Sequence, residues 1–112
     1  MFSTAAILLV AVLLGLTLAF RGLRGRRVTA AWGYAHGALA LLAVVALAVL
    51  AFGAGLPLTG NAALTVASLA LVGGVFNLLF RLQGERPPGF MILLHGAAGV
   101  VALVLLLYAV AS

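Results

Sequence analysis

Four long apolar stretches, separated by short polar segments, occupy almost the whole chain. They run over residues 4–20, 28–52, 61–80 and 90–111 of a 112-residue sequence that is 67% hydrophobic and only 6% charged. A helix needs about 20 apolar residues to cross a bilayer, and no soluble domain could present such a surface to water. The sequence therefore predicts an all-α integral membrane protein, a single four-helix transmembrane domain with short loops.

The positive charge lies in two of the three loops. Four of the six arginines fall in residues 21–27 and two in residues 81–86, whereas residues 53–60 carry no charge. Because basic loops stay on the cytoplasmic side, we expect both arginine-rich loops in the cytoplasm and both termini outside, in a bacterial inner membrane. The bilayer thus accounts for the net charge of +5 without nucleic acid as a partner. Arginines follow the first stretch instead of preceding it, which indicates a retained span and not a signal peptide.

The second half of the chain resembles the first. A numbering shift of 59 superimposes residues 36–38 (His-Gly-Ala) on residues 95–97, and a shift of 60 superimposes much of residues 17–21 on residues 77–81. A difference of one residue is what an insertion in the loop would produce. The pattern predicts a tandem repeat of two-helix units in the same orientation, related by a pseudo-twofold axis along the membrane normal.

His36 and His95 are the only histidines, and each lies nine residues after an arginine, Arg27 or Arg86. Nine residues of helix are roughly 13 Å long. The two helices cross the bilayer in the same direction, so we expect the histidines at one depth, facing each other across the bundle. An imidazole inside a membrane is costly enough to indicate a function.

Two facing imidazoles are a suitable ligand set for haem b, which is held without covalent bonds by one axial ligand on each face. The chain has no cysteine, which excludes a covalently attached haem. Small side chains follow each histidine on its own helical face, where they would form flat walls, and the arginine loops would receive the propionates. Each imidazole is expected to donate its second N–H to a carbonyl one turn earlier, at Trp32 or Met91. The predicted site has His36 and His95 as iron ligands, surrounded by Trp32, Ala40, Ala43, Ala98, Gly99, Ala102, Arg27 and Arg86.

An iron with both axial positions filled has no open site, which favours electron transfer over catalysis. The leading hypothesis is a small membrane b-type cytochrome, not an enzyme, that exchanges single electrons with a quinone or with a larger respiratory or photosynthetic complex. In its paired histidines the chain is similar to membrane b-type cytochromes in general. A homo-oligomer is also compatible with the sequence.

Three alternatives remain open. Gly33 and Gly37 form a GxxxG pattern that can dock a helix without a cofactor, as in an accessory subunit of a larger complex. Each histidine can instead ligate the magnesium of a chlorophyll-type pigment. The length and four spans resemble those of the small multidrug-resistance exporters, but these depend on a glutamate in the first span, and the only acidic residue here is Glu85 in a loop. A transporter is therefore less favoured than a cytochrome or an accessory subunit.

Overall fold

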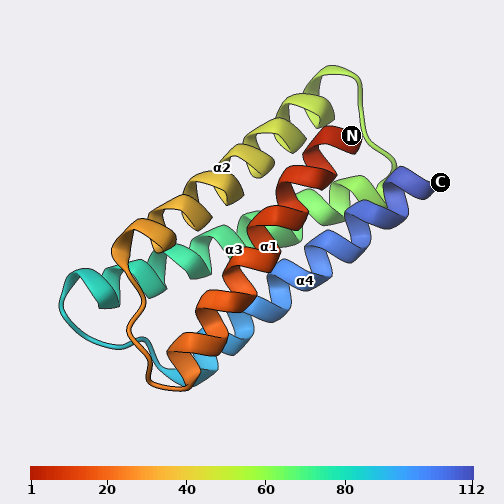
Figure 1. Ribbon diagram of the computed structural model, residues 1–112. Helices are drawn as coiled ribbons and strands as arrows, with labels where there is room; N and C mark the ends of the chain where they lie inside the picture. Colours follow the sequence, from red (N-terminus) through yellow and green to blue (C-terminus); the bar gives the residue numbers. More distant parts are fainter.

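The computed structural model describes all 112 residues and contains four helices and no strand. The helices are α1 (Phe2–Leu23), α2 (Ala30–Gly53), α3 (Leu58–Leu82) and α4 (Gly89–Ala111), shown in Figure 1. Each is long and apolar enough to span a membrane. The predicted all-α, four-helix membrane bundle is thereby confirmed. The Cα atoms extend over 42 × 19 × 19 Å, and a bilayer with its headgroup regions is about 40–45 Å thick.

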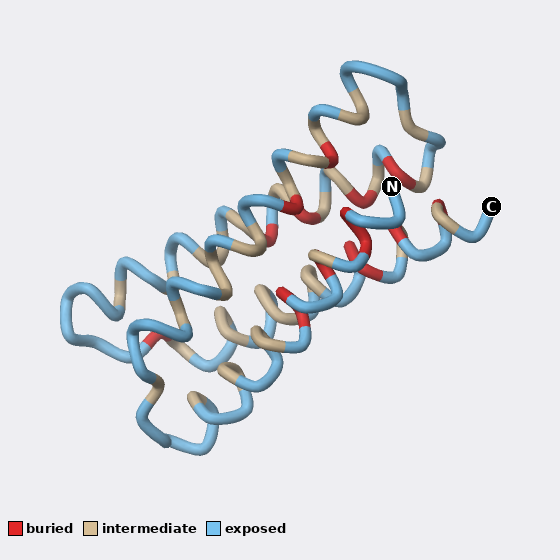
Figure 2. The backbone as a smooth tube through the Cα atoms, turned by 45° about the horizontal axis from the view of Figure 1, so that its top comes forward, coloured by how far each residue is buried: buried red, intermediate tan, exposed pale blue.

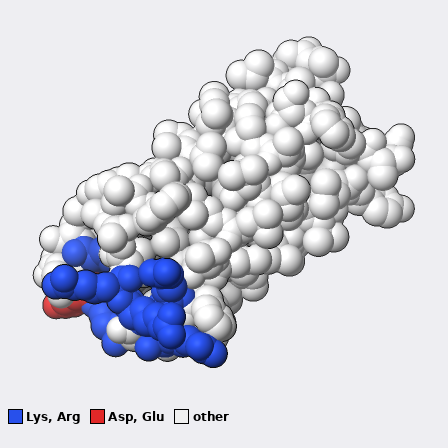
Figure 3. All heavy atoms as spheres, in the orientation of Figure 1, with Lys and Arg blue, Asp and Glu red and all other residues white.

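The helices form a ring in which each one contacts the helices before and after it, and α1 also contacts α4. Helix α1 lies diagonally across the bundle from α3, and α2 lies diagonally from α4. The backbones of these diagonal pairs do not approach each other closely. Both termini and the loop 54–57 lie at one end, which we call the terminal end (Figure 1). The loops 24–29 and 83–88 lie at the other, the arginine end, where the basic side chains gather (Figure 3). The side of the membrane that each end faces stays a prediction from charge.

Two glycines end the helices at the arginine end. Gly25 and Gly84 have positive φ angles of 71° and 76°, a left-handed conformation that costs glycine little and other residues much more. Each glycine follows the last turn of its helix, α1 or α3, and turns the chain away from it, which is the usual glycine-terminated helix end. The chain therefore reverses direction at equivalent points in the two halves.

The two halves of the chain correspond with a single numbering shift of 59. At the end of α1 the Arg26 N–H donates to the Arg21 carbonyl at 2.9 Å, and at the equivalent place after α3 the Glu85 N–H donates to the Phe80 carbonyl at 2.9 Å. The two loops, 24–29 and 83–88, have the same length. The shift of 60 expected for the first helix of each unit, with an insertion in the loop, is therefore wrong. Leucine and phenylalanine recur so often in membrane spans that a few matching side chains do not define a register.

The buried core fills only the half of the bundle near the terminal end (Figure 2). At its centre Ala43, Leu47, Ala102 and Leu106 are all 0% exposed. Small residues let helices approach closely, and this close packing is what holds helices together in lipid. On the arginine side of the two histidines no helical residue is buried, and Pro87 in the loop is the only buried residue. The bundle is therefore packed at one end and open at the other.

Replacing Leu47 or Leu106 by alanine should test the position of the core. Each fully buried leucine would leave a cavity, so we expect the free energy of unfolding in detergent to fall by about 2 kcal/mol or more. Leu41→Ala is the matched control because Leu41 is 52% exposed, and its effect should stay within about 0.5 kcal/mol. Denaturant titration followed by circular dichroism measures all three. Equal losses at Leu41 and Leu47 would contradict a core centred on Leu47 and Leu106.

Candidate functional site

The two histidines meet across the centre of the bundle, at the boundary between its packed and open halves. His36 comes from α2 and His95 from α4, which are diagonal and run in the same direction. Their ring centroids are 5.9 Å apart and the ring planes are nearly perpendicular, at 84°. The equal spacing from the preceding arginines thus corresponds to an equal depth in the structure.

Each imidazole is hydrogen-bonded to the backbone of the adjacent helix in its own half. His36 Nδ1 lies 2.8 Å from the Ala11 carbonyl oxygen, and His95 Nδ1 lies 2.8 Å from the Ala70 carbonyl oxygen. A carbonyl can only accept, so each Nδ1 carries the hydrogen and each Nε2 keeps a free lone pair. Both rings are therefore held as the tautomer that can bind a metal through Nε2.

The expected acceptors for these bonds, the carbonyls of Trp32 and Met91, are wrong. Each histidine side chain points away from its own helix toward the bundle interior, where the neighbouring helix presents the nearest backbone. The carbonyls within a helix are directed along its axis and are already paired with N–H groups one turn further on. The bonds consequently tie α1 to α2 and α3 to α4, instead of bracing each histidine on its own helix.

Gly15 and Gly74 make these contacts possible. A Cβ atom at Gly15 would lie 2.6 Å from His36 Cε1, and one at Gly74 would lie 3.0 Å from His95 Cε1. Each glycine comes four residues after the alanine whose carbonyl accepts the bond, at the position where a side chain would cover that carbonyl. Residue type alone does not single out either glycine. The shift of 59, which aligns Gly15 with Gly74 and Ala11 with Ala70, is the signal that could have found them.

The small residues expected around a cofactor differ in how deeply they are buried. Ala43 and Ala102 are 0% exposed and belong to the core, so they close the site toward the terminal end. Ala40, Ala98 and Gly99 are only half-buried.

Three larger residues expected at the site lie toward the arginine end. Trp32 is 59% exposed, which places its indole on the outside of the bundle, where aromatic residues anchor membrane proteins. Arg86 Nη2 donates to the Gly22 carbonyl at 2.8 Å, at the end of α1. Arg27 is exposed in the loop that follows α1.

The interior on the arginine side of the histidines contains an unsatisfied polar atom. Asn77 Oδ1, on α3 and three residues after Gly74, is buried without a hydrogen-bond partner. A buried acceptor left without a donor costs about 1–3 kcal/mol. Asn77 Oδ1 is therefore a covered acceptor for which the surrounding helices supply no donor.

The distance between the two ring centroids is compatible with one shared metal ion. A metal–imidazole bond is about 2 Å long and the nitrogen is about 1 Å from its ring centre, so rings on opposite sides of one ion have centres about 6 Å apart. The observed distance is 5.9 Å. No cluster of three or more histidine, cysteine, aspartate or glutamate side chains is present. The chain can therefore supply two ligands, which suits a metal whose remaining positions are already filled by a macrocycle.

Comparison with models of known protein families, with curated proteins and with solved structures found no match to this chain. The functional assignment therefore rests on the chemistry of the residues and on their arrangement.

Substituting Gly15 by alanine should displace His36. The added Cβ would lie 2.6 Å from the imidazole, and relieving such overpacking costs about 1–3 kcal/mol. Gly74→Ala should have a smaller effect, because the equivalent distance is 3.0 Å. Gly33→Ala is the matched control, since nothing lies within 4 Å of a Cβ there. Unfolding in detergent measures stability, and the nitrogen chemical shifts of the labelled imidazoles report the hydrogen bond. Equal effects at Gly15 and Gly33 would be inconsistent with the proposed contact.

Proposed function

We propose that this protein is a small membrane b-type cytochrome that passes single electrons within the membrane, with His36 and His95 as the axial ligands of one haem b. The observation that carries the proposal is the histidine pair itself. Its ring centroids lie 5.9 Å apart with the ring planes nearly perpendicular, and each Nδ1 is engaged by a carbonyl so that each Nε2 is free. Two such nitrogens, with no third protein ligand nearby, match the donor set of a bis-histidine haem.

The surroundings of the pair are compatible with a flat macrocycle. Gly15 and Gly74 leave room for the two imidazoles against α1 and α3, the two helices without a ligand. The interior toward the arginine end lacks buried side chains, whereas Ala43 and Ala102 close the opposite side. The arginines gather at the open end (Figure 3), where guanidinium groups can form charge-assisted pairs with carboxylates such as propionates.

The residues of the chain would orient and insulate the redox centre. When bound, a haem with both axial positions filled supplies one-electron chemistry without an open coordination site. The bonds from His36 to Ala11 and from His95 to Ala70 hold each ring in one tautomer and raise the basicity of Nε2. Both histidines are part-buried among apolar helices, and exposure to solvent is one of the factors that set a redox potential. The proposed electron partners are a quinone or a larger respiratory or photosynthetic complex in the same bacterial inner membrane.

An absorption spectrum of the purified protein tests this function. Protein from cells supplied with iron and a haem precursor should be coloured, with the spectrum of a six-coordinate low-spin haem and about one haem per chain. His36→Leu and His95→Leu should each abolish the low-spin spectrum, because each removes one axial ligand.

Tyr34→Leu is the control, since Tyr34 lies on the same turn of α2 as His36 but is 54% exposed. A colourless wild-type preparation, or a spectrum that survives replacement of both histidines, would refute the cytochrome.

A cofactor-free accessory subunit is the second candidate, and one observation favours it. Gly33 and Gly37 lie one turn apart on α2, and nothing lies within 4 Å of the positions of their Cβ atoms. A small-residue face of this kind can dock a helix of another protein closely. For such a subunit, replacing both histidines by leucine would leave co-purification with the larger complex unchanged.

A further inference from the structure

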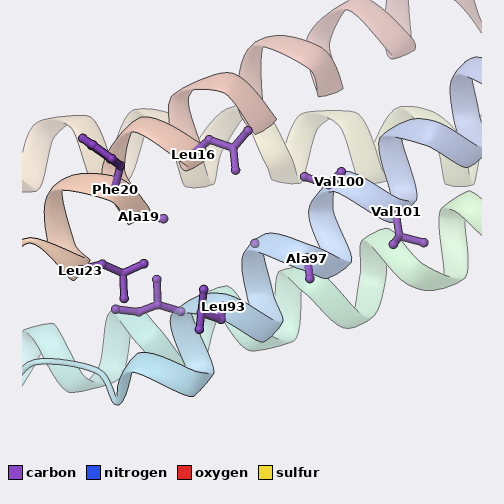
Figure 4. Close-up of a pocket in the computed structure, with 10 residues that line it drawn as sticks. Leu16, Ala19, Phe20, Leu23, Leu93, Ala97, Val100 and Val101 are labelled. Atoms are coloured by element: carbon purple, nitrogen blue, oxygen red, sulfur yellow. The ribbon is translucent and has the colours of Figure 1, made fainter.

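An apolar groove of about 540 Å³ lies between α1 and α4 in the open half of the bundle (Figure 4). Nine of its ten lining residues are hydrophobic, and the tenth is Gly96. Ala97 lines it as well, and lies about 200° around α4 from His95, two residues earlier. Phe20, Leu93 and Val101 in the lining are exposed, so the groove opens to the outside of the bundle, and neither histidine lines it.

Positive charge is present at only one end of this groove. Phe20 lines the groove, and the guanidinium carbon of Arg24 lies over its ring, 4.3 Å from the centroid. Leu23, which also lines the groove, lies 3.9 Å from the position of a Cβ on Gly89. Helices α1 and α4 therefore approach each other at the arginine end of the groove. The chain has six arginines and a single acidic residue. The groove is thus apolar along its length and has an arginine at one end, and no carboxylate lines it.

We propose that the α1–α4 groove binds one anionic phospholipid, with an acyl chain along the groove and the headgroup phosphate against Arg24. The apolar lining selects hydrocarbon, and the groove runs between two spanning helices, the direction in which acyl chains extend. Its charged end lies at the arginine end of the bundle, which is the level of lipid headgroups. Arginine and phosphate form strong charge-assisted pairs, and basic residues at a membrane surface select anionic lipids.

Two other occupants fit the groove less well. A second copy of this chain, inserted in the same orientation, would bring two arginine-rich ends together without an acidic partner. A quinone has a polar but uncharged head that needs hydrogen-bond donors, and the lining offers no polar side chain. Charge complementarity therefore favours the anionic lipid, and this inference is independent of the haem.

Native mass spectrometry of the full chain in detergent, with equal amounts of phosphatidylglycerol and phosphatidylcholine, tests the proposal. The wild type should retain phosphatidylglycerol about fivefold more than phosphatidylcholine, the factor that one arginine near a membrane surface contributes. Arg24→Gln should abolish this preference, and glutamine is the residue that the other half carries at the equivalent position, Gln83. Gly96→Leu should also abolish it, because the leucine would fill the groove without meeting another atom near its Cβ.

Two matched controls separate this site from general effects. Arg26→Gln removes the same charge from the same loop, and Gly37→Leu adds the same side chain at the equivalent position in the first half, which is equally open. Both should keep the preference. Equal retention of the two lipids by the wild type would overturn the proposal. A preference for phosphatidylglycerol that survives Gly96→Leu would also overturn it, because the lipid would then bind at the arginine surface and not in the groove. Displacement of phosphatidylglycerol by a long-chain quinone would assign the groove to the quinone instead.

Discussion

The hydrogen bond from each imidazole to a carbonyl of the neighbouring helix is the interaction on which the arrangement of the site depends. A polar ring inside a membrane is costly unless it is paired, and here one nitrogen of each ring is paired within its two-helix unit, His36 with Ala11 and His95 with Ala70. The bond occupies Nδ1 and leaves Nε2 available. Each helical hairpin therefore presents one lone pair. The pseudo-twofold relation between the hairpins brings the two imidazoles together, so that one motif used twice produces the histidine pair.

Glycine is what allows this bond to form between spanning helices. Helix backbones in a membrane approach closely only where side chains are small, and the ring of His36 occupies the space that a side chain at Gly15 would fill. The same holds for His95 and Gly74. The repetition of this contact in both halves, at one constant shift, is stronger support for an internal duplication than similarity among apolar residues.

The bundle combines a packed half and an open half, and the histidines lie where the two meet. Leu47 and Leu106 fill the packed half together with alanines, and this half sets the relative positions of the four helices. The open half contains the unsatisfied Asn77 oxygen and the outward-facing α1–α4 groove. The interior space and the lipid-facing groove are separated by α4. A redox centre between the histidines and a lipid in the groove would thus contact different faces of the same helix.

The sequence alone determines the number of helices and their approximate limits, because the thickness of a bilayer dictates the length of an apolar span. It also places both arginine-rich loops at the same end of the bundle. The equal depth of His36 and His95 follows in the same way, since each lies nine residues from an arginine at a membrane surface. The sequence did not reveal the true register of the repeat, the carbonyls of Ala11 and Ala70 as acceptors, or the restriction of the core to one half. These features depend on how each helix is rotated about its axis and how closely it approaches its neighbour. A span that is apolar on every side has no polar face to indicate that rotation, so only the packing of the four helices against one another decided it.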